Sequence, residues 1–254
     1  MNNLVLMPIL IPLTVGMILI LFRKNILLQR LLSVLAILAI GMISIFLLNQ
    51  IKTEGIQTLQ LGGWEAPFGV SMVADMFSAL LVLTSSLVAL CCLIYAFRSI
   101  GKDRESYYFY PLFLFLITGV NGSFLTGDLF NLYVCFEVML ISSYVLITLK
   151  GTKIQLRESF KYILVNVVSS FLFLVGIAYL YSITGTLNLA HLSIRIAEAG
   201  QDGLLTTVSF IFIIVFGLKA GLFLFYWLPG SYSVPPTAIA AIFAALLTKV
   251  GIYS

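Results

Sequence analysis

Residues 129–149 read LFNLYVCFEVMLISSYVLITL, an apolar run that contains a single charged residue, Glu137. A run of about 20 apolar residues is long enough to cross the hydrocarbon core of a bilayer as a helix. A charged side chain at bilayer depth costs about 2.5–3.5 kcal/mol on insertion scales, so it normally faces a polar interior and has a partner. The stretch therefore predicts a membrane-spanning helix whose glutamate has a function.

The composition of the whole chain also indicates a membrane protein. Of the 254 residues, 61% are hydrophobic and 9% are charged, whereas soluble domains have about 45–50% apolar and about 25% charged residues. The apolar residues form long blocks rather than the short alternating segments of a β-barrel. We therefore expect an all-α polytopic membrane protein with about eight transmembrane helices, at 4–22, 31–49, 73–97, 108–126, 129–149, 162–184, 206–228 and 236–254.

The basic residues are segregated between alternate connections. Most of the 14 lysines and arginines lie in the first, third and fifth connections, whereas the opposite side carries only Lys52 and Arg195. The positive-inside rule then predicts that the odd-numbered connections are cytoplasmic and that the N-terminus lies outside. Topology explains the net charge of +4, which therefore does not indicate nucleic-acid binding. Lys219 and Lys249 remain, and both fall inside predicted spans.

The intramembrane charges predict a proton relay. At 1.5 Å per residue, Glu137 lies about 13.5 Å from Asp128, and Lys219 lies about 20 Å from Thr206, so both are close to mid-membrane. A carboxylate that gains or loses a proton changes the counter-charge of a nearby ammonium, which can then release its own proton. A protonated Glu137, held by hydrogen bonds between helices, is the alternative.

Lys249 is the third intramembrane charge, about 20 Å along its helix from Pro236. We expect it to extend the relay laterally, so that the three ionisable groups form a series of proton sites with Thr248 and Ser170 as hydrogen-bonding neighbours. The alternative is that Lys249 snorkels outward, since it lies close to Ser254.

Two glycines and a proline are expected to interrupt the span that holds Lys219. Gly217 and Gly221 flank the lysine and remove side-chain bulk, which admits water and frees backbone carbonyls. Interrupted helices at membrane depth line polar cavities in transporters. Close helix packing of the small-xxx-small type is the alternative. Pro229, followed by Gly230, is expected to end this span.

Other polar residues are expected at the helix ends. Asp128 is placed to cap the following helix, and collecting cations at an outer mouth is its alternative role. His191 falls in a predicted amphipathic interfacial helix, 189–199, where a solvated surface role is favoured and its function stays open. The three cysteines and one histidine show no metal-ligand spacing, so we expect no metal and no cofactor.

Five stretches of the second half form recognisable motifs: FNLYVCFEVM at 130–139, TGTLN at 184–188, GLKAG at 217–221, WLPGSYSVPPT at 227–237 and LTKVGIY at 247–253. Together they resemble the antiporter-like subunits, a superfamily that includes the proton-pumping subunits of respiratory complex I. Complex I relatives usually carry a histidine where this chain has Tyr226. The chain is therefore most similar to the D-type subunits of the Mrp multisubunit Na⁺/H⁺ antiporters.

This resemblance implies a domain organisation. Residues 1–107 would hold three N-terminal helices, and residues 108–254 one five-helix antiporter-like repeat with a discontinuous seventh helix. The second, inverted repeat of the family is absent, so the chain looks like the N-terminal half of such a subunit. The resemblance also implies that Glu137 and Lys219 form the relay pair and that Lys249 connects toward the next unit.

The implied function is that of a secondary transporter subunit and not of an enzyme. It would sit in the bacterial plasma membrane with other membrane subunits of an antiporter complex and relay H⁺ to support the export of Na⁺ or another monovalent cation. One alternative is a proton-pumping subunit of a complex I or membrane hydrogenase type redox complex, which would have flavin and iron-sulfur partners. The other is a structural scaffold subunit, in which neutralising the charges leaves transport intact.

Overall fold

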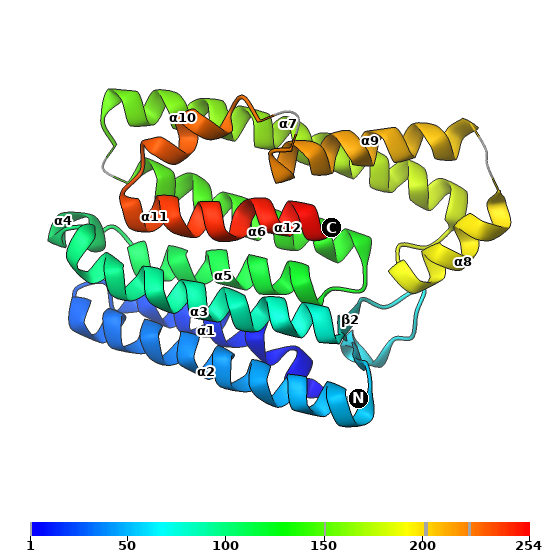
Figure 1. The fold of residues 1–254 in the computed structure, drawn as a ribbon, viewed down its shortest axis with the longest axis horizontal. Coiled ribbons are helices and arrows are strands. Elements are labelled where there is room, and N and C mark those ends of the chain that lie inside the picture. The colour runs from blue at the N-terminus through cyan, green and yellow to red at the C-terminus, as the bar shows by residue number, and fades with distance from the viewer. Residues whose placement is uncertain (1, 150, 201–202, 223–224) are drawn as a thin grey trace.

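The computed structural model describes residues 2–149, 151–200, 203–222 and 225–254. These residues form a bundle of long helices with a small hairpin at one end (Figure 1). The helices are α1 Met7–Leu21, α2 Ile26–Glu54, α3 Met76–Ser99, α4 Lys102–Glu105, α5 Phe109–Leu125, α6 Leu129–Thr148, α7 Lys153–Thr184, α8 Leu189–Ala199, α9 Gly203–Ala220, α10 Leu228–Ser233, α11 Thr237–Ile242 and α12 Thr248–Tyr253.

The helices confirm the all-α polytopic class. Five of them, α2, α3, α6, α7 and α9, are long and apolar enough to cross a membrane. The shorter apolar helices are α1, α5 and the run Thr237–Tyr253. Within this run, a π-helical turn, Phe243–Leu247, joins α11 to α12. Each of these segments overlaps one of the predicted spans.

The connections fall into two groups at opposite ends of the bundle (Figure 1). At one end, here called the basic end, α1 meets α2, α3 meets α5 and α6 meets α7. These are the connections in which basic residues are concentrated. The other end, here called the hairpin end, carries the β-hairpin and α8.

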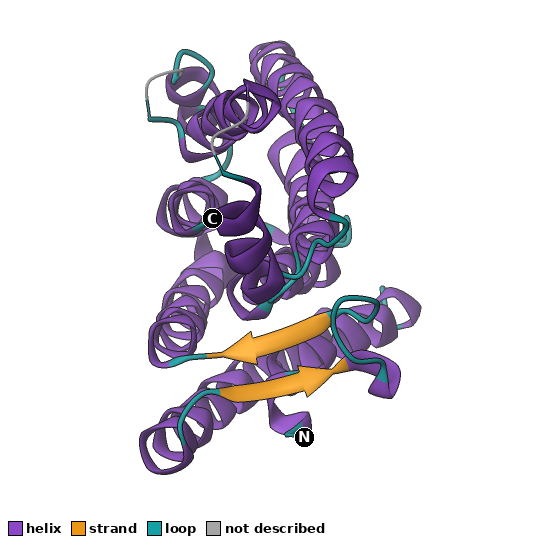
Figure 2. Ribbon diagram, turned by 90° about the vertical axis from the view of Figure 1, so that its right-hand side faces the viewer, coloured by secondary structure: helices purple, strands orange, loops and turns teal. Residues whose placement is uncertain are grey.

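The hairpin is a feature that the sequence analysis missed. Strand β1 (Gln57–Gln60) pairs antiparallel with β2 (Ser71–Ala74), in the connection between α2 and α3. Figure 2 shows the two strands lying across the helix ends. The backbone of Ser71 accepts a hydrogen bond from the Gly127 amide at 2.9 Å, and its hydroxyl accepts one from the Asn188 side chain at 2.7 Å. The hairpin therefore joins the connections that precede α6 and α8.

A buried asparagine fastens three helices together. Pro12 lies inside α1 and has no amide hydrogen to donate to the carbonyl of Pro8. The side-chain nitrogen of Asn121, on α5, donates to that carbonyl at 3.0 Å, while its side-chain oxygen accepts from Ser85 of α3 at 2.7 Å. Asn121 thus compensates for the proline.

Replacing Asn121 by alanine is expected to destabilise the bundle, because the Pro8 carbonyl loses its donor inside the protein. An unsatisfied buried polar group costs about 1–3 kcal/mol. Thermal unfolding of the full-length protein in detergent should show a lower Tm for Asn121→Ala than for Asn49→Ala, a control at an exposed position of α2. Equal Tm values for the two variants would contradict this role.

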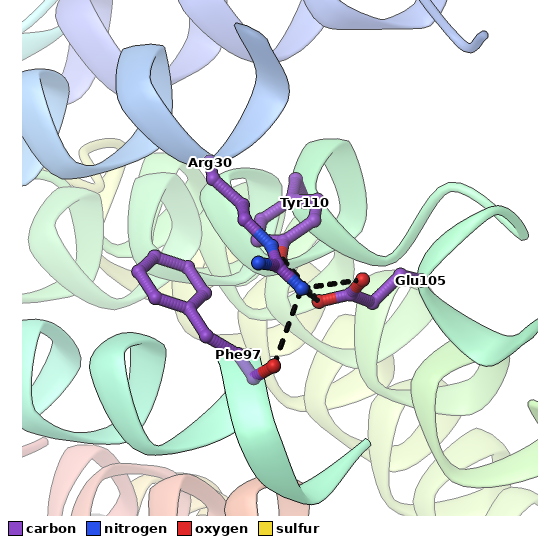
Figure 3. Close-up of polar contacts among 4 residues, drawn as sticks. All are labelled: Arg30, Phe97, Glu105 and Tyr110. Carbon is purple, nitrogen blue, oxygen red and sulfur yellow. Dashed lines mark hydrogen bonds and ion pairs between the residues drawn. The ribbon is translucent and has the colours of Figure 1, made fainter. Parts of the chain in front are cut away.

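At the basic end, a buried carboxylate of α4 is held by side chains from α2 and α5. Glu105 has only 1% of its side chain exposed, and the Arg30 guanidinium contacts its two carboxylate oxygens at 2.7 and 2.8 Å. The Tyr110 hydroxyl donates to the same carboxylate at 2.7 Å. Arg30 also donates to the Phe97 carbonyl at 3.2 Å (Figure 3). The network joins α2, the end of α3, α4 and α5.

Candidate functional site

The buried ammonium of Lys219 is the centre of the candidate site. Lys219 lies in the last turn of α9 and is 5% exposed. Its Nζ donates to the Ser170 hydroxyl of α7 at 3.2 Å and lies 4.7 Å from the centre of the Phe136 ring of α6. A hydroxyl and an aromatic face together hold the cation. The expected hydrogen-bonding neighbour Ser170 is therefore in place.

Glu137 follows Phe136 on α6 and lies near Lys219 without bonding to it. The adjacent residue Phe136 places its ring 4.7 Å from the Lys219 Nζ, but no hydrogen bond or ion pair joins Glu137 and Lys219 among the described residues. The carboxylate atom Oε1 is buried and has no hydrogen-bond partner among the described residues. Glu137 and Lys219 form no ion pair in the structure, so none has to break before either changes its protonation, and their role as a relay pair stays a prediction.

The helix that carries Lys219 ends earlier than predicted. The expected span continued to residue 228, whereas α9 ends at Ala220 and stops partway along α7 (Figure 1). Gly221 has φ +64°, a left-handed conformation that ends helices and favours glycine. The Leu222 amide then donates back to the Gly217 carbonyl at 3.1 Å.

The three residues expected to break this helix have different positions. Gly217 lies inside the continuous part of α9. Only its backbone carbonyl takes part in the helix end, by accepting the hydrogen bond from the Leu222 amide. Gly221 makes the break itself. Pro229, which was expected to end the span, lies instead in the first turn of α10, where a missing amide hydrogen has little cost. Pro229 therefore begins the next helix.

Lys249 points back along its own helix. Its Nζ donates to the Ala244 carbonyl at 2.8 Å and contacts the Thr248 hydroxyl at 3.3 Å. Ala244 belongs to the π-helical turn, a distortion that is frequent at functional sites. The ammonium therefore lies on the Ala244 side of Lys249 and does not reach toward Ser254.

Close packing brings the helix of Lys249 against that of Lys219. A Cβ atom added to Gly251 of α12 would lie 2.6 Å from the Ala220 amide nitrogen and 2.8 Å from the Lys219 carbonyl carbon. Only glycine allows this approach, because the contacted atoms are backbone. Gly251 thus sets α12 directly on the end of α9.

A row of buried polar residues on α7 leads from the basic end toward Lys219, and sequence analysis missed all of it except Ser170. The Tyr162 hydroxyl is hydrogen-bonded to Ser143 of α6 at 2.8 Å, and the Asn166 amide donates to the Tyr162 carbonyl at 2.9 Å. Polar residues at helical spacing within an apolar span were the available signal. The row consists of Gln155, Ser159, Tyr162, Asn166 and Ser170, all buried.

The polar residues at the hairpin end serve as helix caps. Asp128 accepts the Asn131 amide at 2.9 Å and is buried, which raises the pKa of its carboxyl above the usual value, although backbone hydrogen bonds oppose the shift. A buried carboxylate presents little surface on which to collect cations. His191 lies in α8, which confirms the predicted helix 189–199, and its amide is capped by Asn188 at 3.2 Å.

Fold and site together define a polytopic helical membrane protein with ionisable side chains inside its bundle and an interrupted helix beside one of them. The family model described as NADH:quinone oxidoreductase/Mrp antiporter, TM, matches residues 126–254. The chain belongs to this family.

Curated relatives cover the whole chain. It is 56% identical over 255 residues to the D-type subunit of the Na⁺/H⁺ antiporter of Alkalihalophilus pseudofirmus, and 55% identical over 256 residues to that of Bacillus subtilis. Each match covers 100% of this chain and 52% of the relative. The chain therefore spans about half the length of these relatives.

Two solved structures share the fold at 28% sequence identity. A chain of the membrane-bound sulfane sulfur reductase, an archaeal respiratory membrane complex, matches with a TM-score of 0.92 over 99% of this chain and 52% of that chain. A chain of the Mrp complex from a Dietzia species matches with a TM-score of 0.88 over 100% of this chain and 48% of that chain.

Proposed function

We propose that this chain forms part of a transporter subunit, in a cation/proton antiporter complex, that relays protons through Glu137, Lys219 and Lys249. The relay would support Na⁺ export driven by H⁺ uptake. The observation that carries the proposal is the ammonium of Lys219, 5% exposed beside an interrupted helix. Evolution tolerates such a buried charge where it serves ion movement.

The arrangement of Glu137 and Lys219 suits a relay. When Glu137 is ionised it stabilises the ammonium, and when Glu137 is protonated that attraction is lost. The Ser170 hydroxyl can both accept a hydrogen bond from the ammonium and donate one to the neutral amine. Lys219 therefore keeps a hydrogen-bond partner in both protonation states.

Lys249 is proposed as the next site of the relay. Its helix rests on the end of α9 through Gly251, so the backbones of the two lysine-bearing helices are in direct contact, although the Lys249 side chain itself is exposed. The Thr248 hydroxyl beside Lys249 gives it a second hydrogen-bond partner besides the Ala244 carbonyl. The three ionisable residues thus come from α6, α9 and α12, which pack in one half of the bundle.

The lengths of the relatives support the proposed organisation. We assign residues 108–254 to a first antiporter-like repeat and place a second repeat in the part of the relatives that this chain does not cover. The proposed partners are the other membrane subunits of the complex, in a bacterial plasma membrane with the basic end cytoplasmic. The names of the two curated relatives, both subunits of a Na⁺/H⁺ antiporter, support this assignment.

A redox-driven proton pump is the second candidate, favoured by the match to the sulfane sulfur reductase complex at a TM-score of 0.92. The same charges would then respond to electron flow. The much higher sequence identity to antiporter subunits, 56% against 28%, favours the antiporter.

Reconstituting the complete complex, with the full-length subunit, in proteoliposomes tests the function. An imposed pH gradient should drive uptake of radioactive Na⁺, and Na⁺ addition should dissipate the gradient, without any electron donor. Copurified flavin or iron-sulfur proteins, together with ion movement only when an electron donor is supplied, would favour the redox pump and contradict the antiporter.

A further inference from the structure

A small cavity lies beside Lys219, on the side facing the polar row of α7. Its polar lining consists of Tyr162, Asn166, Lys219 and Trp227, and the rest of its wall is apolar. The volume open to the centre of a water-sized sphere is about 10 Å³, which is about the room required by one water molecule. The cavity is too small for any organic ligand.

Trp227 gives this cavity an unpaired hydrogen-bond donor. The residue is 4% exposed, and its Nε1 is buried without a hydrogen-bond acceptor among the described residues. An indole nitrogen only donates, so the site requires an oxygen. Leaving such a donor unpaired costs about 1–3 kcal/mol.

Two further groups complete the coordination that a water needs. The ammonium of Lys219 has three hydrogens, of which one is donated to Ser170. The Asn166 amide nitrogen donates to the Tyr162 carbonyl, and its side-chain oxygen remains an acceptor. Buried waters typically make about three hydrogen bonds, and this wall offers two donors and one acceptor.

We propose that this cavity binds one water molecule, held by Trp227, Asn166 and Lys219. The water oxygen accepts from the indole and from the ammonium, and one of its hydrogens is donated to the Asn166 oxygen. A monovalent cation does not fit, because it would face the ammonium and the indole hydrogen. A halide would face the Asn166 oxygen and needs more room than the cavity has.

The water makes Trp227 and Asn166 positioning residues for Lys219. It extends the polar row of α7 to the ammonium and holds one of the ammonium's hydrogens in the cavity lined by Asn166 and Trp227. This inference deepens the proposed relay, and its effect on exchange rests on that proposal. The existence of the water site does not.

The test compares the assembled full-length complex carrying Trp227→Phe with one carrying Trp64→Phe. Phenylalanine keeps an aromatic ring and removes the indole donor. Trp64 is a matched control, because the chain has two tryptophans and Trp64 is 68% exposed near the hairpin. The readouts are a high-resolution density map, an ultraviolet resonance Raman difference spectrum of the indole N–H, and Na⁺/H⁺ exchange.

The wild-type map should show one density peak about 3 Å from Nε1, and the Raman difference for Trp227→Phe should show loss of a hydrogen-bonded indole. Exchange should fall roughly three- to tenfold in Trp227→Phe, as for loss of one hydrogen bond of about 0.7–1.4 kcal/mol, and stay unchanged in Trp64→Phe. An indole signature of a free N–H, an empty site in the map, or a halide peak would each overturn the proposal. If Trp227→Phe fails to assemble, the wild-type map still shows whether the cavity holds a water molecule.

The outcomes separate this inference from the relay. A density peak combined with full exchange in a Lys219→Met complex would leave the water site standing and overturn the relay. Loss of exchange in Lys219→Met, with no density peak near Trp227 in the wild-type map, would support the relay and overturn the water site.

Discussion

Replacing Lys219 by methionine is expected to reduce Na⁺/H⁺ exchange to the background of vesicles that lack the complex. Methionine has nearly the length of lysine and no charge, so it removes the buried ammonium and its insertion cost together. The Ser170 hydroxyl can still donate within its own helix, which limits the structural damage. Exchange is measured in inside-out vesicles by the recovery of a pH-sensitive dye when Na⁺ is added.

Matched variants separate the relay from assembly. Glu137→Gln should behave like Lys219→Met, because it keeps the shape of the side chain and cannot change its charge. Lys161→Met should retain exchange, because Lys161 is an exposed lysine of α7 that pairs with Glu158 at 2.8 Å. Full exchange in the Lys219→Met complex would contradict the relay. Full exchange in both Lys219→Met and Glu137→Gln, with the complex present in the membrane, would favour the scaffold alternative.

The fold class could be predicted because hydrophobic length is a local property. The stretch around Glu137 is apolar for a full membrane thickness, and α6 occupies it. The cap made by Asp128 was predictable for the same reason, since a cap depends on residues three positions apart. Burial of Lys219 followed from its position within such a run.

The end of α9 could not be predicted from hydrophobicity. The residues after Gly221 are as apolar as those before it, so the run reads as one span to residue 228. The helix ends because Gly221 has a positive φ. Gly217, the same residue type four positions earlier, keeps a helical conformation. The contact of Gly251 with the end of α9 lies equally outside local sequence patterns.

Contacts between segments that are distant in the sequence could not be predicted either. Glu105 and Tyr110 meet Arg30 across more than 70 positions of sequence, and Arg30 itself reads as one more basic residue of a connection. The pairing of β1 with β2 joins two four-residue strands, which are too short to show a clear alternation. Nothing in either segment alone indicates its partner.

Replacing Glu105 by alanine is expected to destabilise the protein by about 3 kcal/mol. Removing one partner of a buried ion pair typically costs about 3–5 kcal/mol, and the lower value applies because Arg30 is 32% exposed and water can reach it. The substitution also removes the acceptor of the Tyr110 hydroxyl. Thermal unfolding of the purified complex in detergent measures the effect as a fall in Tm.

The expected effect is specific to burial and not to the loss of a carboxylate. Glu198 pairs with Arg195 at 3.3 Å on the surface of α8, and both side chains are exposed, so Glu198→Ala should cost less than about 1 kcal/mol. In a double-mutant cycle, Arg30→Met should lower Tm less in the Glu105→Ala background than in the wild type, because the lone guanidinium has already lost its partner. Additive effects would show that Arg30 and Glu105 stabilise the bundle independently and would contradict the network drawn in Figure 3.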